Sequence, residues 1–170
     1  MKLMVQIPCY NEAGTLPEVL RDIPKSIEGI SVIEVLIIDD GSTDETVAVA
    51  RQHGVQHIVS HKANKGLARS FQSGIERCIE LGADIIVNTD GDNQYAGSSI
   101  PDLVRPIVEG KADVVIGDRQ PGRNTDFSLL KRLLQRLGSA VVRHVARVDV
   151  GDAVSGFRAY SRDAALKINV

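Results

Sequence analysis

Short apolar segments rich in β-branched residues alternate along the chain with longer segments of helical spacing. Each apolar segment is bounded by Gly, Asp, Asn or Pro, which predicts strands at residues 3–7, 32–38, 55–59, 84–87 and 113–116. Apolar residues spaced for one helix face predict helices at residues 16–27, 43–53, 67–81 and 100–109. Strands that alternate with helices form right-handed βαβ units. The pattern therefore predicts an α/β domain with a mostly parallel sheet and helices on both faces.

The alternation stops after the fifth predicted strand. Residues 119–126 are polar and contain Pro and Gly, and residues 127–147 form a basic amphipathic segment. Residues 167–170 read as the start of a helix that lacks a capping signal. We interpret residues 1–170 as one domain that is truncated at its carboxyl end.

Composition and charge narrow the classes of function. With 170 residues and 43% hydrophobic content, the chain can build one α/β core. The 20 Lys and Arg nearly balance the 22 Asp and Glu, so the overall charge gives no reason to expect nucleic acid as a partner. Cys9 and Cys78 lie far apart without CxxC spacing, which favours buried free thiols over a disulfide or zinc site. No signal-peptide pattern or run of 18 apolar residues occurs, so we expect a soluble, cytoplasmic domain.

Acidic residues follow the predicted strands directly. In open parallel sheets ligands bind beyond the carboxyl ends of the strands, so these residues should gather at one edge. Carboxylates this close repel one another unless a cation joins them, and oxygen ligands suit Mg²⁺ or Mn²⁺. Because Mg²⁺ usually takes some ligands from substrate phosphates, the pattern favours a substrate that carries a diphosphate. The segments concerned are residues 8–12, 39–42, 88–92 and 117–119.

Each of these signals also has a structural interpretation. Residues 42–45 have capping-box spacing, so Asp44 and Glu45 fit the start of a helix. The sequence Asp90-Gly91-Asp92 is also a common turn. The histidines are scattered along the chain, and we interpret them as ordinary surface or core residues. Cys9 has no adjacent base, which favours packing over nucleophilic catalysis.

No glycine-rich phosphate-binding loop is present, neither GxxxxGK[ST] nor GxGxxG. Phosphates must then be held by a metal ion and by basic side chains. A solvated helix face is the alternative interpretation for the last basic residues. The candidates are Lys65, Arg69, Arg119, Arg123, Lys131 and Arg132.

The strand-end segments, in this order and spacing, resemble the family 2 inverting glycosyltransferases with the GT-A fold. Within that family they are most similar to the polyprenyl-phosphate branch, which includes dolichyl-phosphate mannosyltransferases. The resemblance covers nearly the whole chain, and it implies a Rossmann-like sheet. It rests on residues 7–12, 37–44, 64–67, 90–95, 117–119 and 154–160.

The resemblance implies a nucleotide-diphosphate sugar, GDP- or UDP-linked, as the donor. Pro8, Tyr10 and Glu12 match family residues that hold the base and ribose. Ile38 and Asp40 complete that pocket.

The resemblance also implies a metal site with Mg²⁺ or Mn²⁺ as the cofactor. Asp90 and Asp92 match the DxD signature, with Gly91 between them in contact with the donor. Gln94 occupies the place of a third residue that faces the metal. Arg119 matches an arginine that contacts phosphate.

On the acceptor side, Lys131 or Arg132 falls where the branch has a basic residue near a lipid phosphate. Residues 95–97 read Tyr-Ala-Gly, which departs from the His-Pro-Pro-like run common in the branch. Family members continue past the position of Val170. We therefore expect attachment to the cytoplasmic face of a membrane to come from a part of the protein that follows Val170.

The hypothesis from the sequence is displacement at the anomeric carbon with metal stabilisation of the leaving diphosphate, and with Asp92 essential. A sugar hydroxyl acceptor needs a carboxylate base, for which Asp152 is the candidate, although anchoring a turn is its structural alternative. A polyprenyl phosphate needs no base. Three other classes come into consideration. A sugar-1-phosphate nucleotidyltransferase expects a Gly-rich basic first loop, but residues 9–13 read Cys-Tyr-Asn-Glu-Ala, and a receiver domain expects a lysine after strand five, where residues 117–119 read Gly-Asp-Arg. A non-catalytic nucleotide-sugar-binding module remains as the alternative.

Overall fold

The computed structural model describes residues 1–91, 96–117 and 155–168. Among these residues six strands form one sheet in the order β3-β2-β1-β4-β6-β5. The strands are β1 Lys2–Cys9, β2 Val32–Asp39, β3 His57–Ser60, β4 Ile85–Asn88, β5 Val114–Ile116 and β6 Arg158–Ser161. The helices are α1 Leu16–Asp22, α2 Thr46–Gln52, α3 Leu67–Glu80, α4 Ile100–Val108 and α6 Arg162–Lys167, with a 3₁₀ turn η1 at Gly97–Ser99.

Strand β1 is the centre of the sheet. It pairs in parallel with β2 on one side and with β4 on the other, so that Val5 lies opposite both Val35 and Val87. Strand β3 adds to β2, also in parallel. These pairings confirm the predicted mostly parallel sheet, and they bring the carboxyl ends of β1, β2 and β4 to one edge.

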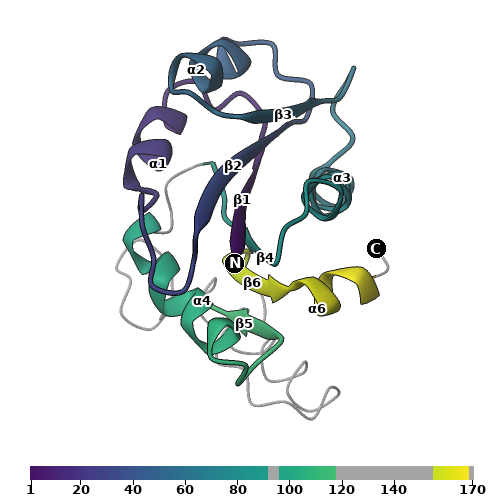
Figure 1. Ribbon diagram of the computed structural model, residues 1–170. Coiled ribbons are helices and arrows are strands. Elements are labelled where there is room, and N and C mark those ends of the chain that lie inside the picture. Colours follow the sequence, from purple (N-terminus) through teal and green to yellow (C-terminus); the bar gives the residue numbers. More distant parts are fainter. Residues whose placement is uncertain (92–95, 118–154, 169–170) are drawn as a thin grey trace, which may run out of the picture.

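Two layers of helices cover the two faces of the sheet (Figure 1). Leu3, Val5 and Ile7 of β1 lie in the core beneath α1, α2 and α4. Met4, from the alternate positions of the same strand, packs in the second core beneath α3 and α6. Because neighbouring residues of β1 are buried on opposite faces, the strand reads as a continuous apolar run.

The first two predicted helices are shorter than the sequence pattern suggested. Helix α1 ends at Asp22 rather than residue 27 because Ile23 precedes Pro24 and adopts an extended conformation, with φ −66° and ψ 125°. Helix α2 begins at Thr46 rather than at residue 43. In both places turn chemistry at the helix end outweighs the apolar spacing.

The sequence pattern did not predict β6. This short strand runs antiparallel between β4 and β5, with Ala159 opposite both Val87 and Val115. The final helix was also predicted in the wrong place. Helix α6 begins after Ser161, whose Oγ accepts a hydrogen bond from the Ala164 N–H at 3.2 Å and so caps it. None of the described helices is both long and apolar enough to cross a membrane.

Helix α3 packs so closely on β1 that its Gly74 has no space for a side chain. A Cβ at this position would lie 2.3 Å from Gln6 Oε1 and 2.8 Å from Ile38 Cδ1, and both of those residues are fully buried. Gly74→Ala should therefore lower the free energy of unfolding by about 1–3 kcal/mol. A decrease in stability would point to the close packing, because Ala in a helix interior is otherwise more favourable than Gly by up to about 1 kcal/mol.

Urea denaturation followed by circular dichroism measures this change. The control is Gly14→Ala, since nothing lies within 4 Å of a Cβ at Gly14. Unchanged or increased stability of Gly74→Ala would contradict the close packing of α3 on β1.

Candidate functional site

The loops after β1, β2 and β4 surround one cavity of about 350 Å³. The cavity lies beyond the carboxyl ends of these strands, where ligands bind in open α/β sheets. Its lining residues come from the three strand ends, the segment before α3 and the first turn of α3. They are Pro8, Cys9, Tyr10, Glu12, Asp40, Asn64, Gly66, Leu67, Ser70, Asp90 and Gly91.

The structure therefore brings together most of the residues that the sequence predicted for nucleotide-sugar binding. Pro8, Tyr10, Glu12, Asp40, Asp90 and Gly91 all line the cavity. Ile38 does not line it: this side chain is fully buried in the core beneath α3. The remaining predicted site residues lie outside the described part of the chain, namely Asp92, Gln94, Arg119, Lys131, Arg132 and Asp152.

The loop after β1 is held in place by the loop after β2. Asn11 has a left-handed backbone with φ 57°, a conformation that Asn tolerates better than most residues. Its side-chain Oδ1 accepts a hydrogen bond from the Thr43 N–H at 2.8 Å, and its own N–H donates to Ser42 Oγ at 3.0 Å. The Glu12 N–H donates to Thr46 Oγ1 at 2.9 Å. These bonds fix the positions of Tyr10 and Glu12 at the mouth of the cavity.

The capping-box interpretation of residues 42–45 was wrong. Glu45 is the N-cap of α2 and makes no side-chain capping bond, while Ser42 bonds to Asn11 instead. Asp44 accepts hydrogen bonds from the Thr46 N–H at 3.0 Å and from the Ala13 N–H at 3.1 Å. Asp44 therefore ties the loops after β1 and β2 together while it satisfies a donor at the start of α2.

Asp40 is a buried carboxylate that organises the segment before α3. Its oxygens accept hydrogen bonds from the backbone N–H of Lys65 at 2.9 Å and of Gly66 at 2.8 Å, and His61 Nδ1 lies 2.8 Å from Oδ1. Burial opposes ionisation of Asp40, but these hydrogen bonds outweigh it and lower its pKa below the ordinary value. The carboxylate thus stays charged and holds the Lys65–Gly66 wall of the cavity.

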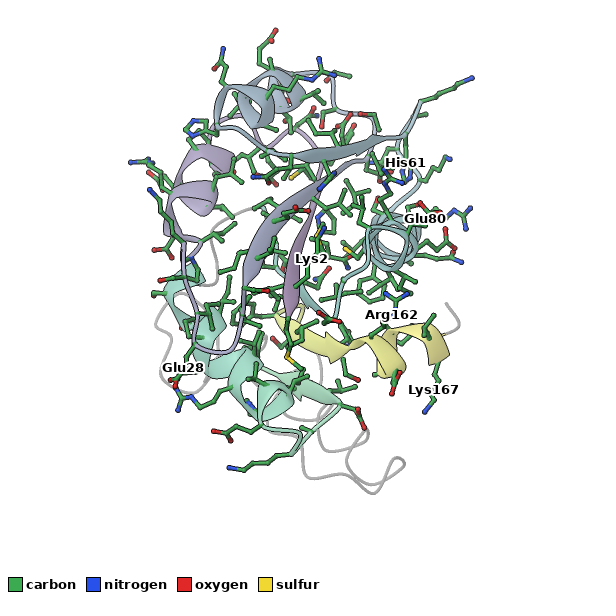
Figure 2. The ribbon with its side chains drawn as sticks, in the orientation of Figure 1. Lys2, Glu28, His61, Glu80, Arg162 and Lys167 are labelled. Carbon is green, nitrogen blue, oxygen red and sulfur yellow. The ribbon has the colours of Figure 1, made fainter. Side chains whose placement is uncertain are left out.

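His61 is a residue that the sequence interpretation missed. Its side chain is buried between Asp40 and α3, with Nε2 3.1 Å from Ser73 Oγ (Figure 2). Spacing along the chain, four residues after His57, gives no sign of this role. The signal that identifies it is position, because His61 directly follows β3 and so lies at the same edge of the sheet as the other strand ends.

The segment after β4 packs against the loop after β1. Thr15 belongs to the loop after β1, and its Oγ1 lies 2.6 Å from Glu12 Oε2 in the same loop and 2.9 Å from the Gly91 carbonyl oxygen after β4. The hydroxyl can donate to either acceptor, and its bond to Gly91 links the two segments. A Cβ on Gly91 would lie 3.2 Å from Cys9 Sγ, which shows how closely the two segments approach. These contacts hold Gly91, and with it the segment that carries Asp90, against the loop after β1.

Cys9 contributes a buried wall to the cavity and not a reactive group. Burial raises the pKa of its thiol far above the ordinary value, and the nearby carboxylates of Glu12 and Asp39 raise it further. Its Sγ donates to the Ile7 carbonyl at 3.5 Å. Cys9 and Cys78 are both free and buried, as the sequence predicted.

The donor atoms at this edge suit a hard cation. Glu12 and Asp90 supply carboxylate oxygens to one cavity, and oxygen ligands of this kind suit Mg²⁺ or Mn²⁺. Within residues 1–91, 96–117 and 155–168, no three His, Cys, Asp or Glu side chains are grouped to hold a metal ion by themselves.

Comparison with known proteins agrees with this arrangement. Residues 4–168 match the family Glycosyl transferase family 2. The UDP-N-acetylglucosamine–dolichyl-phosphate N-acetylglucosaminyltransferase of Methanococcus voltae is 27% identical over 176 residues, covering 93% of this chain and 68% of that protein. The dolichol-phosphate mannosyltransferase of Pyrococcus furiosus is 29% identical over 171 residues, covering 96% and 47%.

Among solved structures, the chain resembles glucosyl-3-phosphoglycerate synthase from Mycobacterium tuberculosis in complex with Mn²⁺, UDP and glucosyl-3-phosphoglycerate. The TM-score is 0.71 at 22% identity, covering 95% of this chain and 57% of that one. The chain thus spans about half to two thirds of the length of these proteins.

The mostly parallel sheet with its inserted antiparallel strand, together with the acidic cavity at the strand ends, defines a glycosyltransferase domain of the GT-A fold. The chain belongs to glycosyl transferase family 2. Its similarity to dolichyl- and undecaprenyl-phosphate sugar transferases associates it with the polyprenyl-phosphate branch of that family.

The role of Asp40 as an anchor can be tested by substitution with Asn. Asp40→Asn removes the charge that accepts hydrogen bonds from two backbone N–H groups, and we expect the free energy of unfolding to fall by about 1–3 kcal/mol near neutral pH. Because folding lowers the pKa of Asp40, its contribution is present above the ordinary value of 3.8 and is lost as the pH falls below it. The difference between variant and wild type should therefore shrink as the pH falls from about 5 to about 3.

Chemical denaturation at a series of pH values measures this difference. Asp84→Asn is the control, because this exposed carboxylate also accepts a backbone N–H, from Lys2 at 2.7 Å, but lies away from the cavity. A difference that stays constant down to about pH 3 would show that the Asp40 charge is not what stabilises the segment.

Proposed function

We propose that this domain is a metal-dependent, inverting glycosyltransferase that moves a sugar from a nucleotide-diphosphate sugar to a polyprenyl phosphate. The observation that carries the proposal is the cavity at the ends of β1, β2 and β4, which is lined by Asp90 together with Glu12 and Asp40. Family membership supports sugar transfer, and the lipid-phosphate names of several relatives support the acceptor class.

The nucleoside of the donor is assigned to the side of the cavity formed by β1 and β2. Tyr10 is about half exposed there, at 47%, and offers an aromatic face on which a base can stack. Pro8 and Glu12 flank it, and Asp40 holds the opposite wall. A solved structure of the same fold contains UDP, and one relative is named for a UDP-linked sugar, which supports a uridine donor. A GDP-linked donor is the alternative.

The metal is assigned to Asp90 and Asp92, with Gln94 as a further ligand. When bound, Mg²⁺ or Mn²⁺ would neutralise negative charge on the departing diphosphate. Asp90 is the described member of this set, and its place in the lining of the cavity supports the assignment. Mn²⁺ in structural relatives supports a divalent ion, and the carboxylate oxygens suit either metal.

In the proposed reaction, an acceptor oxygen forms a bond to the anomeric carbon as the bond from that carbon to the diphosphate oxygen breaks. The configuration inverts because attack and departure occur on opposite sides. Asn11, Asp44 and Asp40 fix the loops that hold the donor, so reaching this geometry costs little entropy. Arg119 is assigned to the leaving diphosphate.

The acceptor side is assigned to Lys131 or Arg132, as a cation for the lipid phosphate. A phosphate oxygen is already anionic, so no protein base is needed for attack. A sugar hydroxyl must instead lose a proton, and Asp152 is the residue assigned to accept it in that case. The two acceptor classes therefore make different demands on the protein.

Asp92→Asn should abolish metal-dependent transfer while leaving the fold intact. We expect release of nucleoside diphosphate to fall by about 100-fold or more, because a neutral amide holds the metal poorly and charge on the leaving group stays unbalanced. A coupled assay for released diphosphate with Mn²⁺ measures this, and circular dichroism checks the fold. Asp102→Asn, on the exposed side of α4, is the control. Near-normal transfer by Asp92→Asn would refute the metal assignment.

The donor and acceptor can be separated in one panel. GDP-, UDP- and dTDP-sugars are each supplied with Mg²⁺ or Mn²⁺, and with a polyprenyl phosphate or a free sugar as the acceptor. We expect one nucleotide to be preferred and release to depend on the polyprenyl phosphate, with Asp152→Asn as active as wild type. Faster release with a free sugar, and its loss in Asp152→Asn, would replace the lipid phosphate with a hydroxyl acceptor. Binding without any release would favour a non-catalytic module.

A further inference from the structure

Two polar side chains are buried side by side in the apolar centre of the sheet. Gln6 of β1 is fully buried and Asn88 of β4 is 5% exposed. The two residues lie opposite each other in the parallel pairing, so their side chains are on the same face. Gln6 Nε2 donates a hydrogen bond to Asn88 Oδ1 at 2.9 Å. Buried amides destabilise a core unless they are hydrogen-bonded, so this pair needs an explanation.

Asn88 passes the connection on to a turn that precedes β6. Its Nδ2 donates to the carbonyl oxygen of Gly156 at 2.8 Å. The same turn is held by Arg158, whose Nε donates to the Ser155 carbonyl at 2.7 Å, and by a bond from the Phe157 N–H to Ser155 Oγ at 3.2 Å. The turn at residues 155–157 is therefore fixed by side chains of β4 and β6.

This turn lies directly against the carboxylate of Asp90. A Cβ built on Gly156 would be 2.9 Å from Asp90 Oδ2 and 3.2 Å from Oδ1. At such distances a side chain and the carboxylate cannot both keep their positions, so the backbone of Gly156 forms one wall of the space that the carboxylate occupies. A displacement of the turn would therefore change the space in which the Asp90 carboxylate lies.

We propose that Asn88 is a positioning residue, oriented by Gln6, that holds the turn at residues 155–157 against Asp90 and so sets the carboxylate for metal binding. The inference rests on the proposed function, because it takes Asp90 as a metal ligand. Asn88 acts through Gly156 and touches neither metal nor donor in this account.

The hydrogen bonds also fix which way the Asn88 amide points. Its NH₂ group must face the Gly156 carbonyl, because the amide oxygen there would repel another oxygen. Gln6 Nε2 satisfies the oxygen on the other side and so favours this orientation. The arrangement has a cost: Gln6 Oε1 is buried and has no hydrogen-bond partner among the described residues. An apolar residue would avoid that cost, which argues that Gln6 is there to orient Asn88 rather than to stabilise the core.

The test separates metal-dependent from metal-free binding. Calorimetry with UDP and with GDP, each with and without Mn²⁺, gives the gain in affinity that Mn²⁺ provides for the nucleotide that wild type prefers. Asn88→Leu should reduce this gain by roughly two- to tenfold, the effect of losing about one hydrogen bond. Affinity without Mn²⁺ should change less than about twofold, since the nucleoside side of the cavity does not contact the turn.

Gln6→Leu is the second variant, and it does not depend on the tolerance of Asn88→Leu. It removes the unpartnered Oε1 but leaves Asn88 Oδ1 without its donor, so its melting temperature should stay close to that of wild type. The gain from Mn²⁺ should nevertheless fall, because the Asn88 amide is no longer held. A reduced gain at nearly unchanged stability is not expected from a residue that only fills the core.

Ser161→Ala is the matched control. It removes the cap of α6 at the far end of β6 and should lower stability without touching the turn or Asp90. Its gain from Mn²⁺ should equal that of wild type. Equal gains in Asn88→Leu, Gln6→Leu and this control would overturn the positioning role.

Gly156→Ala approaches the same turn from the other side. It should reduce the gain from Mn²⁺ on its own, and combined with Asn88→Leu the two losses should be less than additive, because both act by moving one turn. Fully additive losses would contradict a shared route. A wild-type chain in which Mn²⁺ gives no gain for either nucleotide would contradict the proposed function itself, and the positioning role with it.

Discussion

The parallel pairing of β1 with both β2 and β4 is the constraint on which the rest of the structure depends. It directs three chain segments out of the sheet at the same edge, with Asp40 and Asp90 at the roots of two of them. The sheet can be this tightly ordered because residues of β1 are buried alternately under α1, α2 and α4 on one face and under α3 and α6 on the other. A cavity built on fully buried strands is more precise than one built on loops alone.

Hydrogen bonds from short polar side chains then convert this edge into a defined site. Asn11 and Asp44 join the loops after β1 and β2, while Asp40 accepts hydrogen bonds from the backbone of the segment before α3. Each of these acceptors takes backbone N–H groups that a loop would otherwise leave to water. The site is therefore preorganised by hydrogen bonds to carboxylate and amide oxygens and by backbone geometry at the same time.

Much of this could be predicted from the sequence, and the failures have physical causes. The alternation of apolar segments gave five of the strands, and the strand-end residues Glu12, Asp40 and Asp90 do meet at one cavity. Strand β6 escaped prediction because residues 158–161 form a short segment whose pairing with β4 comes from distant chain contacts. The roles of His61, Asp44 and Asn88 depend on which partner each meets in space, and linear spacing does not encode that.

The insertion of β6 between β4 and β5 has a consequence for how this domain can diversify. The Gly117 N–H donates to the Phe157 carbonyl at 2.8 Å, so the chain leaves the sheet after β5 and re-enters it before β6 at neighbouring points. Lengthening a chain between two fixed points costs little, about 0.6 kcal/mol for each doubling. The number of residues between Gly117 and Phe157 can therefore change at little cost to the pairing of β5 with β6. The sheet and the length of this connection are thus largely independent of each other.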